Sequence, residues 1–331
     1  MRDFACHTCG QRLVFENSVC LNCDSPVGYS LADHDVLVID PSRFQPCANL
    51  NLAACNWLVP AGYEAGLCES CALTRTRPAD TDTEFLALFA EAEAAKRRLV
   101  AELHDLGLPL VGKAEDPQGG LAFDLLSSAT ENVVIGHADG VITLDLAEGD
   151  DAHREQMRAE LAEPYRTLLG HFRHESGHYY YTVLVTDDTV KQQFMQLFGD
   201  PDADYQAALD RHYSEGAPAG WEDEFVSSYA TMHAAEDWAE TFAHYLHIRD
   251  TLDTAAAFGF APAGVSIDKP KPGRVGFDQL IEHWLPLAWS LNMVNRSMGH
   301  PDLYPFVLAP KVLDKMAFVH ELVAARGQGN S

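Results

Sequence analysis

The stretch His174-Glu175-Ser176-Gly177-His178 follows the pattern H-E-x-x-H, and the interpretation of the whole chain depends on it. Residues four apart lie on one face of a helix, so both imidazoles can bind a single metal ion. The glutamate between them then lies where it can accept a proton from a metal-bound water. Because the pattern also occurs by chance, its value depends on the flanking sequence and on a third ligand.

The residues around the motif predict a helix over 165–185. This stretch contains no proline, and Gly170 and Gly177 are its only glycines. Its leucine and aromatic residues recur at helical spacing and supply an apolar face. His171 lies on the same stripe, but about 10.5 Å of helix axis separates it from His178 at roughly 1.5 Å per residue. One ion cannot bind all three histidines, so we expect His171 to support the motif or pack against it.

A second helix, predicted over 233–248, offers a third ligand because it contains two glutamates one turn apart. Glu236 and Glu240 lie on the face opposite its large apolar residues. Such pairs are usually solvated surface charges. After an H-E-x-x-H helix, however, one glutamate is a good metal ligand and the other can hold a ligating histidine through its free N–H. His233 and His244 are the alternative ligands. No histidine follows the motif in a nearby glycine-containing turn, as an all-histidine site requires.

The eight cysteines all precede residue 72 and form two quartets. The first quartet is Cys6, Cys9, Cys20 and Cys23, and the second is Cys47, Cys55, Cys68 and Cys71. Two C-x-x-C pairs make the first quartet typical of a zinc ribbon, in which four thiolates bind one zinc ion. The second has looser spacing, and free or buried thiols are its alternative. The simplest arrangement is two sequential structural zinc sites, while one that mixes pairs from both quartets stays open.

The composition indicates a packed protein with a strongly acidic surface. The chain has 331 residues, 47% of them apolar, and a formal net charge of -26. A negative surface repels phosphate backbones, so we expect no nucleic-acid partner. It is compatible with cationic substrates or partners, and equally with a simple gain in solubility. No run of about 18 apolar residues and no apolar leader occurs, which predicts a cytoplasmic protein without membrane attachment.

The remaining chain alternates between helical and strand-like patterns. Asp139-Gly140 between β-branched runs indicates a hairpin over 132–146, whose edge strand can accept an extended peptide. Further elements are predicted as a helix over 82–106, a strand over 121–126, a helical segment over 153–161 and helices over most of 270–326. We expect a zinc-ribbon domain over 1–78 with both cysteine sites, and a second domain over 79–331.

The two helices that offer metal ligands resemble a known catalytic site. Tyr229 followed by Glu236-Asp237-Trp238-Ala239-Glu240-Thr241-Phe242 is similar to the matching segment of the anthrax lethal factor catalytic domain. This resemblance implies a gluzincin metallopeptidase with a catalytic zinc ion bound by His174, His178 and Glu236. It also implies that Glu175 is the general base, that Tyr229 stabilises the oxyanion, and that Glu240 supports a ligating histidine.

The chain as a whole resembles a bacterial family of zinc-binding metallopeptidases with an N-terminal zinc ribbon. The matching parts are both cysteine quartets, the H-E-x-x-H helix, the helix over 233–248 and the segment over 295–306. The resemblance implies an α+β fold: a zinc ribbon, then a mainly helical zincin-like metallopeptidase domain over 79–331 with a small antiparallel sheet. It implies one catalytic and two structural zinc ions, and a peptide or protein substrate.

Two other functions stay open at this point. One is a zinc-stabilised adaptor, in which the ribbon binds a protein partner and the third metal site is vestigial or structural. The other is a hydrolase of a different amide, such as an isopeptide bond. The ribbon also offers a surface for a protein partner if the chain is a peptidase.

Overall fold

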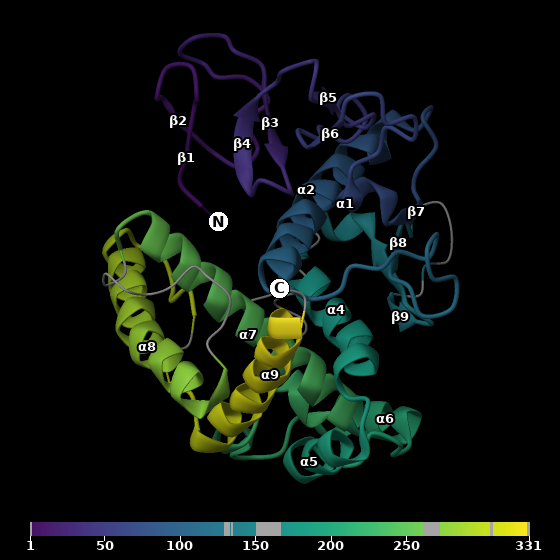
Figure 1. The fold of residues 1–331 in the computed structure, drawn as a ribbon. Coiled ribbons are helices and arrows are strands. Elements are labelled where there is room, and N and C mark those ends of the chain that lie inside the picture. The colour runs from purple at the N-terminus through teal and green to yellow at the C-terminus, as the bar shows by residue number, and fades with distance from the viewer. Residues whose placement is uncertain are drawn as a thin grey trace. The chain divides into compact units, whose positions relative to one another are not determined.

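The computed structural model describes residues 2–128, 133, 135–149, 167–260, 272–304 and 307–329 (Figure 1). The predicted helical segment over 153–161 lies outside these residues. The chain divides into two compact units: unit 1 comprises Met1–Glu102 and Leu110–Leu169, and unit 2 comprises Leu103–Pro109 and Gly170–Ser331. Among the described residues, no helix has the length and apolar character needed to cross a membrane.

The first part of unit 1 consists of three short antiparallel hairpins around an aromatic core. Its elements are β1 (Phe4–Ala5), β2 (Arg12–Leu13), β3 (Val27–Ser30), β4 (Asp35–Val38), β5 (Phe44–Pro46), β6 (Leu58–Pro60) and α1 (Glu69–Ala72). The strands pair as β1 with β2, β3 with β4, and β5 with β6. Trp57 is fully buried, and its ring lies 5.1 Å from that of Tyr29. This core is small, and domains of this size usually rely on metal ions, disulfide bonds or oligomerisation for stability.

The second part of unit 1 is one long helix with a four-stranded sheet. The helix α2 spans Thr83–Asp105, and the strands are β7 (Thr74–Thr76), β8 (Ala122–Leu126), β9 (Gly136–Ala138) and β10 (Val141–Asp145), followed by the turn η1 (Leu146–Gly149). The predicted hairpin forms between β9 and β10, with positive φ at Asp139 and Gly140. The sheet is mixed, however, because β8 is parallel to both β7 and β10. A parallel pair needs a long crossover connection, which local turn signals do not predict.

Unit 2 is helical, as predicted. Its elements are α4 (Leu168–Leu184), α5 (Asp188–Phe198), α6 (Tyr205–Glu215), η2 (Trp221–Asp223), η3 (Tyr229–Thr231), α7 (Ala234–Ala257), α8 (Gly273–Ser297) and α9 (Pro310–Gly329). In Figure 1, α7 is the green helix that contacts α8 and α9, and η3 and α5 also contact it. Trp238 and Phe242 of α7 are fully buried in this core. The predicted α+β class, with a mainly helical second part, is therefore confirmed.

The helices α4 and α7 approach closely at a glycine within the H-E-x-x-H motif. A Cβ atom on Gly177 would lie 2.9 Å from the Cα atom of Ala239, so a larger residue would push the two helices apart. The indole of Trp238 also donates a hydrogen bond to the carbonyl oxygen of Gly177 at 2.8 Å. Small residues at the crossing therefore bring the motif next to the glutamates of α7.

Candidate metal centre

Three predicted ligands from two helices come together in unit 2. Nitrogen atoms of His174 and His178 on α4 and an oxygen of Glu236 on α7 all lie within 4.8 Å of one another. The Glu236 Oε2 atom is 3.1 Å from His174 Nε2 and 3.5 Å from His178 Nε2. Glu236 is 3% exposed. Two imidazole nitrogens and a carboxylate oxygen are a usual donor set for catalytic zinc.

Glu175 lies beside this cluster with one oxygen atom unused. Its Oε1 atom is 3.3 Å from His171 Nε2, which places His171 beside the motif as expected. Its Oε2 atom is buried and has no hydrogen-bond partner among the described residues. Burial opposes ionisation, but the hydrogen bond with His171 and the neighbouring histidines lower the pKa of Glu175 below its usual range. A buried carboxylate oxygen without a protein partner among the residues that the structure describes fits a position next to a metal-bound water, so the residues present fit a metal centre.

Glu240 contacts the other nitrogen of His174, as a supporting carboxylate does. Its Oε1 atom is 2.6 Å from His174 Nδ1, and the Ser227 hydroxyl donates to its Oε2 atom at 2.6 Å. Burial raises the pKa of Glu240, but the hydrogen bond with His174 and the nearby charges lower it to about 2. A carboxylate on Nδ1 fixes the imidazole ring with Nε2 directed at the cluster.

The Ser227 side chain connects the contact between Glu240 and His174 to the turn that carries Tyr229. Its Oγ atom accepts a hydrogen bond from the backbone N–H of Ala230 at 3.1 Å while it donates to Glu240. We expect Ser227→Ala to weaken metal binding at the cluster about 10-fold, since such supporting contacts typically contribute that much. Competition with a zinc chelator measures this. Ser228→Ala is the matched control, because the Ser228 side chain makes no capping hydrogen bond; equal losses in both variants would contradict the prediction.

Tyr229 lies close to the cluster on the turn η3. Its ring centroid is 6.1 Å from that of His174. Burial and the nearby carboxylate of Glu236 raise the pKa of Tyr229 well above its usual range, so the hydroxyl stays protonated and can donate a hydrogen bond. A second phenol, which the sequence analysis missed, belongs to Tyr205: its hydroxyl donates to Glu236 Oε1 at 3.0 Å. No local signal identifies Tyr205, because it precedes Glu236 by 31 residues on a different helix.

The alternative ligands lie outside the cluster. His233 caps the N-terminus of α7: its Nδ1 atom accepts from the Ala235 N–H at 3.1 Å, and its Nε2 atom is 3.1 Å from the Ala203 carbonyl oxygen. His244 makes a hydrogen bond through Nδ1 with the Tyr304 hydroxyl. Both histidines therefore have other partners, and Glu236 takes the third position in the cluster.

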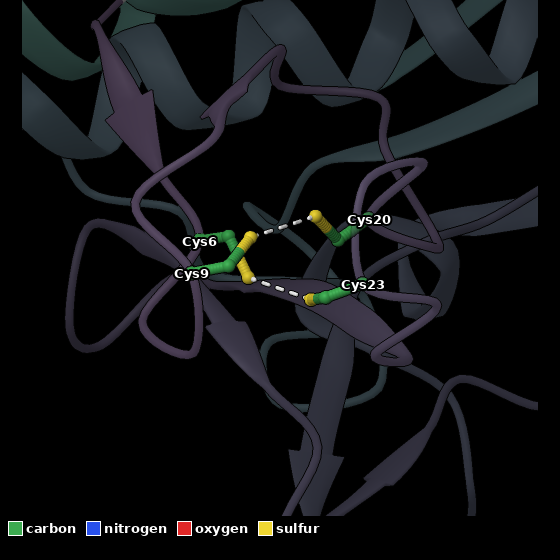
Figure 2. Close-up of side chains that lie close together, drawn as sticks. All are labelled: Cys6, Cys9, Cys20 and Cys23. Carbon is green, nitrogen blue, oxygen red and sulfur yellow. Dashed lines mark hydrogen bonds between the residues drawn. The ribbon is translucent and has the colours of Figure 1, made fainter.

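The cysteines of unit 1 come together as two sequential quartets. Figure 2 shows the first, in which the sulfur atoms of Cys6 and Cys23 are 3.7 Å apart and those of Cys9 and Cys20 are 3.6 Å apart. In the second, Cys55 and Cys68 are separated by 3.7 Å. Thiolates around tetrahedral zinc lie about 3.8 Å apart, given Zn–S bonds of about 2.3 Å, whereas a disulfide bond is only about 2.0 Å long. The geometry fits two four-cysteine zinc sites, and the quartets do not mix.

The helix α2 places charged side chains next to the second quartet. Arg97 donates to the carbonyl oxygens of Ala53 and Ala54, both at 3.3 Å, next to Cys55. Glu93 lies 3.7 Å from the Cys71 sulfur and accepts from the Lys96 ammonium at 2.6 Å. Four thiolates around one zinc ion would have a net negative charge, and because Lys96 is already paired with Glu93, the Arg97 guanidinium next to Cys55 would offset only part of it. All four cysteines of this quartet are buried, whereas Cys9 of the first is exposed.

Comparison with known proteins identifies both parts of the chain. Residues 86–322 match the profile of a family described as "Putative zinc-binding metallo-peptidase", and residues 3–82 match that of a zinc-ribbon domain. A protein of Mycobacterium bovis and one of Mycobacterium tuberculosis, each named as uncharacterized, are both 65% identical over 325 residues, which covers 98% of this chain and 95% of theirs. No solved structure matches the chain.

Proposed function

The chain belongs to this family of zinc-binding metallo-peptidases, and from that membership we propose that it hydrolyses peptide bonds at a zinc ion bound by His174, His178 and Glu236. The convergence of these three donor atoms within 4.8 Å is the observation that supports the proposal most strongly. Two histidines of an H-E-x-x-H motif with a glutamate from a later helix make the site gluzincin-like. The substrate is a peptide or protein of the cytoplasm.

The side chains around the cluster have separate roles in the proposed reaction. Zinc, when bound, acts as a Lewis acid that polarises the scissile carbonyl and activates a water molecule. Glu175 accepts the proton of the attacking water and passes it to the leaving amine. Its buried Oε2 atom, for which the described residues provide no partner, supports this role. Tyr229 donates a hydrogen bond to the oxyanion of the tetrahedral intermediate.

The two cysteine quartets have a structural role in this proposal. Each binds one zinc ion, so the loaded protein contains three: one catalytic and two structural. A ribbon with so small a core folds only with its metals. We also propose that the ribbon presents a surface to a protein partner, whereas the acidic charge of the chain opposes nucleic acid.

Metal content and cleavage together test the function. We expect three zinc ions per wild-type chain and two per His178→Ala chain, because that variant lacks one of the three ligands at the catalytic site. The wild type should cleave a peptide library. The His178→Ala variant should not cleave it, and neither should the wild type after a chelator has removed its zinc. An adaptor would bind zinc and cleave nothing, which would refute the proposal. Cleavage confined to lysine side-chain amides would instead identify an isopeptidase.

A further inference from the structure

We propose that Tyr205 is a positioning residue that limits Glu236 to one metal-binding oxygen. The two carboxylate oxygens of Glu236 have different partners. Its Oε2 atom lies 3.1 Å and 3.5 Å from the Nε2 atoms of His174 and His178. Its Oε1 atom accepts a hydrogen bond from the Tyr205 hydroxyl at 3.0 Å. One oxygen therefore faces the metal position, while the phenol occupies the other.

This division matters because a carboxylate binds metal ions through one oxygen or through both. A catalytic zinc site has three protein ligands and leaves its fourth position to water. If both oxygens of Glu236 bound the ion, protein atoms would take that fourth position. Glu236 is 3% exposed whereas Tyr205 is 42% exposed, so the carboxylate is shielded from solvent although the tyrosine is not. The hydroxyl of Tyr205 thus fixes the rotation of the carboxylate and keeps a position for the water.

The ring of Tyr205 is held by contacts that do not involve its hydroxyl. Tyr205 is the first residue of α6, and the Asp204 side chain caps this helix by accepting from the Ala207 N–H at 3.0 Å. The ring of Tyr205 meets that of His233 edge-on, with centroids 5.3 Å apart. A phenylalanine at this position keeps these contacts. The variant therefore removes the hydrogen bond to Glu236, together with the interaction of the hydroxyl with Tyr229, while the helix and the ring stay in place.

Tyr205→Phe is expected to lower zinc affinity at this site 10- to 100-fold, the usual effect of losing a contact that orients a ligand. The protein is prepared with zinc in both cysteine sites, and affinity at the third site is measured by competition with a chelator. Cobalt(II) added to that site reports on its coordination through its visible spectrum, which should differ between wild type and variant. The matched control is Tyr213→Phe, on the same helix with a 67% exposed side chain, which should change neither measurement.

A double-mutant cycle separates positioning from a merely structural effect. If Tyr205 acts through Glu236, then Tyr205→Phe should cause little further loss of zinc affinity in a Glu236→Asp background, in which the shorter side chain keeps a carboxylate for the metal but moves it away from the Tyr205 hydroxyl. An equal loss in both backgrounds would show that the hydroxyl stabilises the fold instead, and would overturn the inference. Wild-type affinity together with a wild-type cobalt spectrum in Tyr205→Phe would overturn it as well.

The inference rests on the proposed zinc site, but its test needs no substrate. Zinc affinity and the cobalt spectrum are measured on the resting protein. A chain that cleaves no peptide but shows the predicted coupling between Tyr205 and Glu236 would refute the proposed peptidase function and support the positioning role. A chain that cleaves peptides but lacks this coupling would support the proposed peptidase function and refute the positioning role.

Discussion

Glu175→Gln is expected to keep zinc at the site and to lower kcat/KM for peptide hydrolysis about 10²- to 10⁴-fold, the range typical of a lost general base. The amide has nearly the same shape as the carboxylate but cannot accept the proton of the attacking water. Glu175 lies next to His174 in the chain, yet it is not among the three clustered donors, so the metal should stay bound. Zinc content and steady-state kinetics on a cleaved peptide measure the two effects.

The control for this variant is Glu215→Gln, which removes the same charge from an exposed position at the end of α6. It should retain both zinc and activity. Hydrolysis by Glu175→Gln at the wild-type rate would refute the proposed role of Glu175. Loss of zinc together with activity would show that Glu175 contributes to metal binding.

Cys68→Ser is expected to unfold much of unit 1. A structural zinc ion contributes about 10–16 kcal/mol of binding free energy to folding. Whole domains are stable by only about 5–15 kcal/mol, so loss of this ion exceeds what unit 1 can tolerate. Cys68 is 1% exposed, and the quartet lies beside the buried Glu93 and Lys96 of α2, both 0% exposed. Without the metal, these charged groups would surround an empty, partly protonated thiol cluster.

Hydrogen exchange monitored along the chain measures this effect, with zinc content determined in parallel. Amides of α2 and β8 should lose their protection from exchange. The strand β8 is connected to the second quartet because the backbone N–H of Phe123 donates a hydrogen bond at 2.8 Å to the carbonyl oxygen of Leu73, which follows Cys71 by two residues. Cys9→Ser, at the exposed cysteine of the first quartet, is the comparison. It should also lose one zinc ion, but deprotect mainly residues near β1 and β2, because this site is partly open to solvent at Cys9 whereas all four cysteines of the second quartet are buried. Equal protection of α2 in both variants would refute the structural difference between the two quartets.

The long helices and the hairpin turn could be predicted closely from the sequence, whereas the short helices α5 and α6 were not predicted. The predicted helices over 82–106 and 165–185 correspond to α2 and α4, and the Asp139-Gly140 turn forms where expected. Helical periodicity and turn chemistry depend on residues a few positions apart, so they are present in the local sequence. The parallel pairing of β8 with β10 was not predicted, because it depends on a crossover rather than on a turn.

The sequence by itself determined the residue types and spacings of the metal-binding motifs: the paired histidines with Glu175, the three C-x-x-C pairs, and two glutamates one turn apart. Only the tertiary structure decided which glutamate faces which nitrogen of His174. The close crossing of α4 and α7 at Gly177 brings Glu236 to Nε2 and Glu240 to Nδ1. Tyr205 joined the site in the same way, since its contact with Glu236 spans 31 residues and arises from packing between helices. Spacing within one helix is local, whereas the distance between side chains of separate helices is set by how those helices pack.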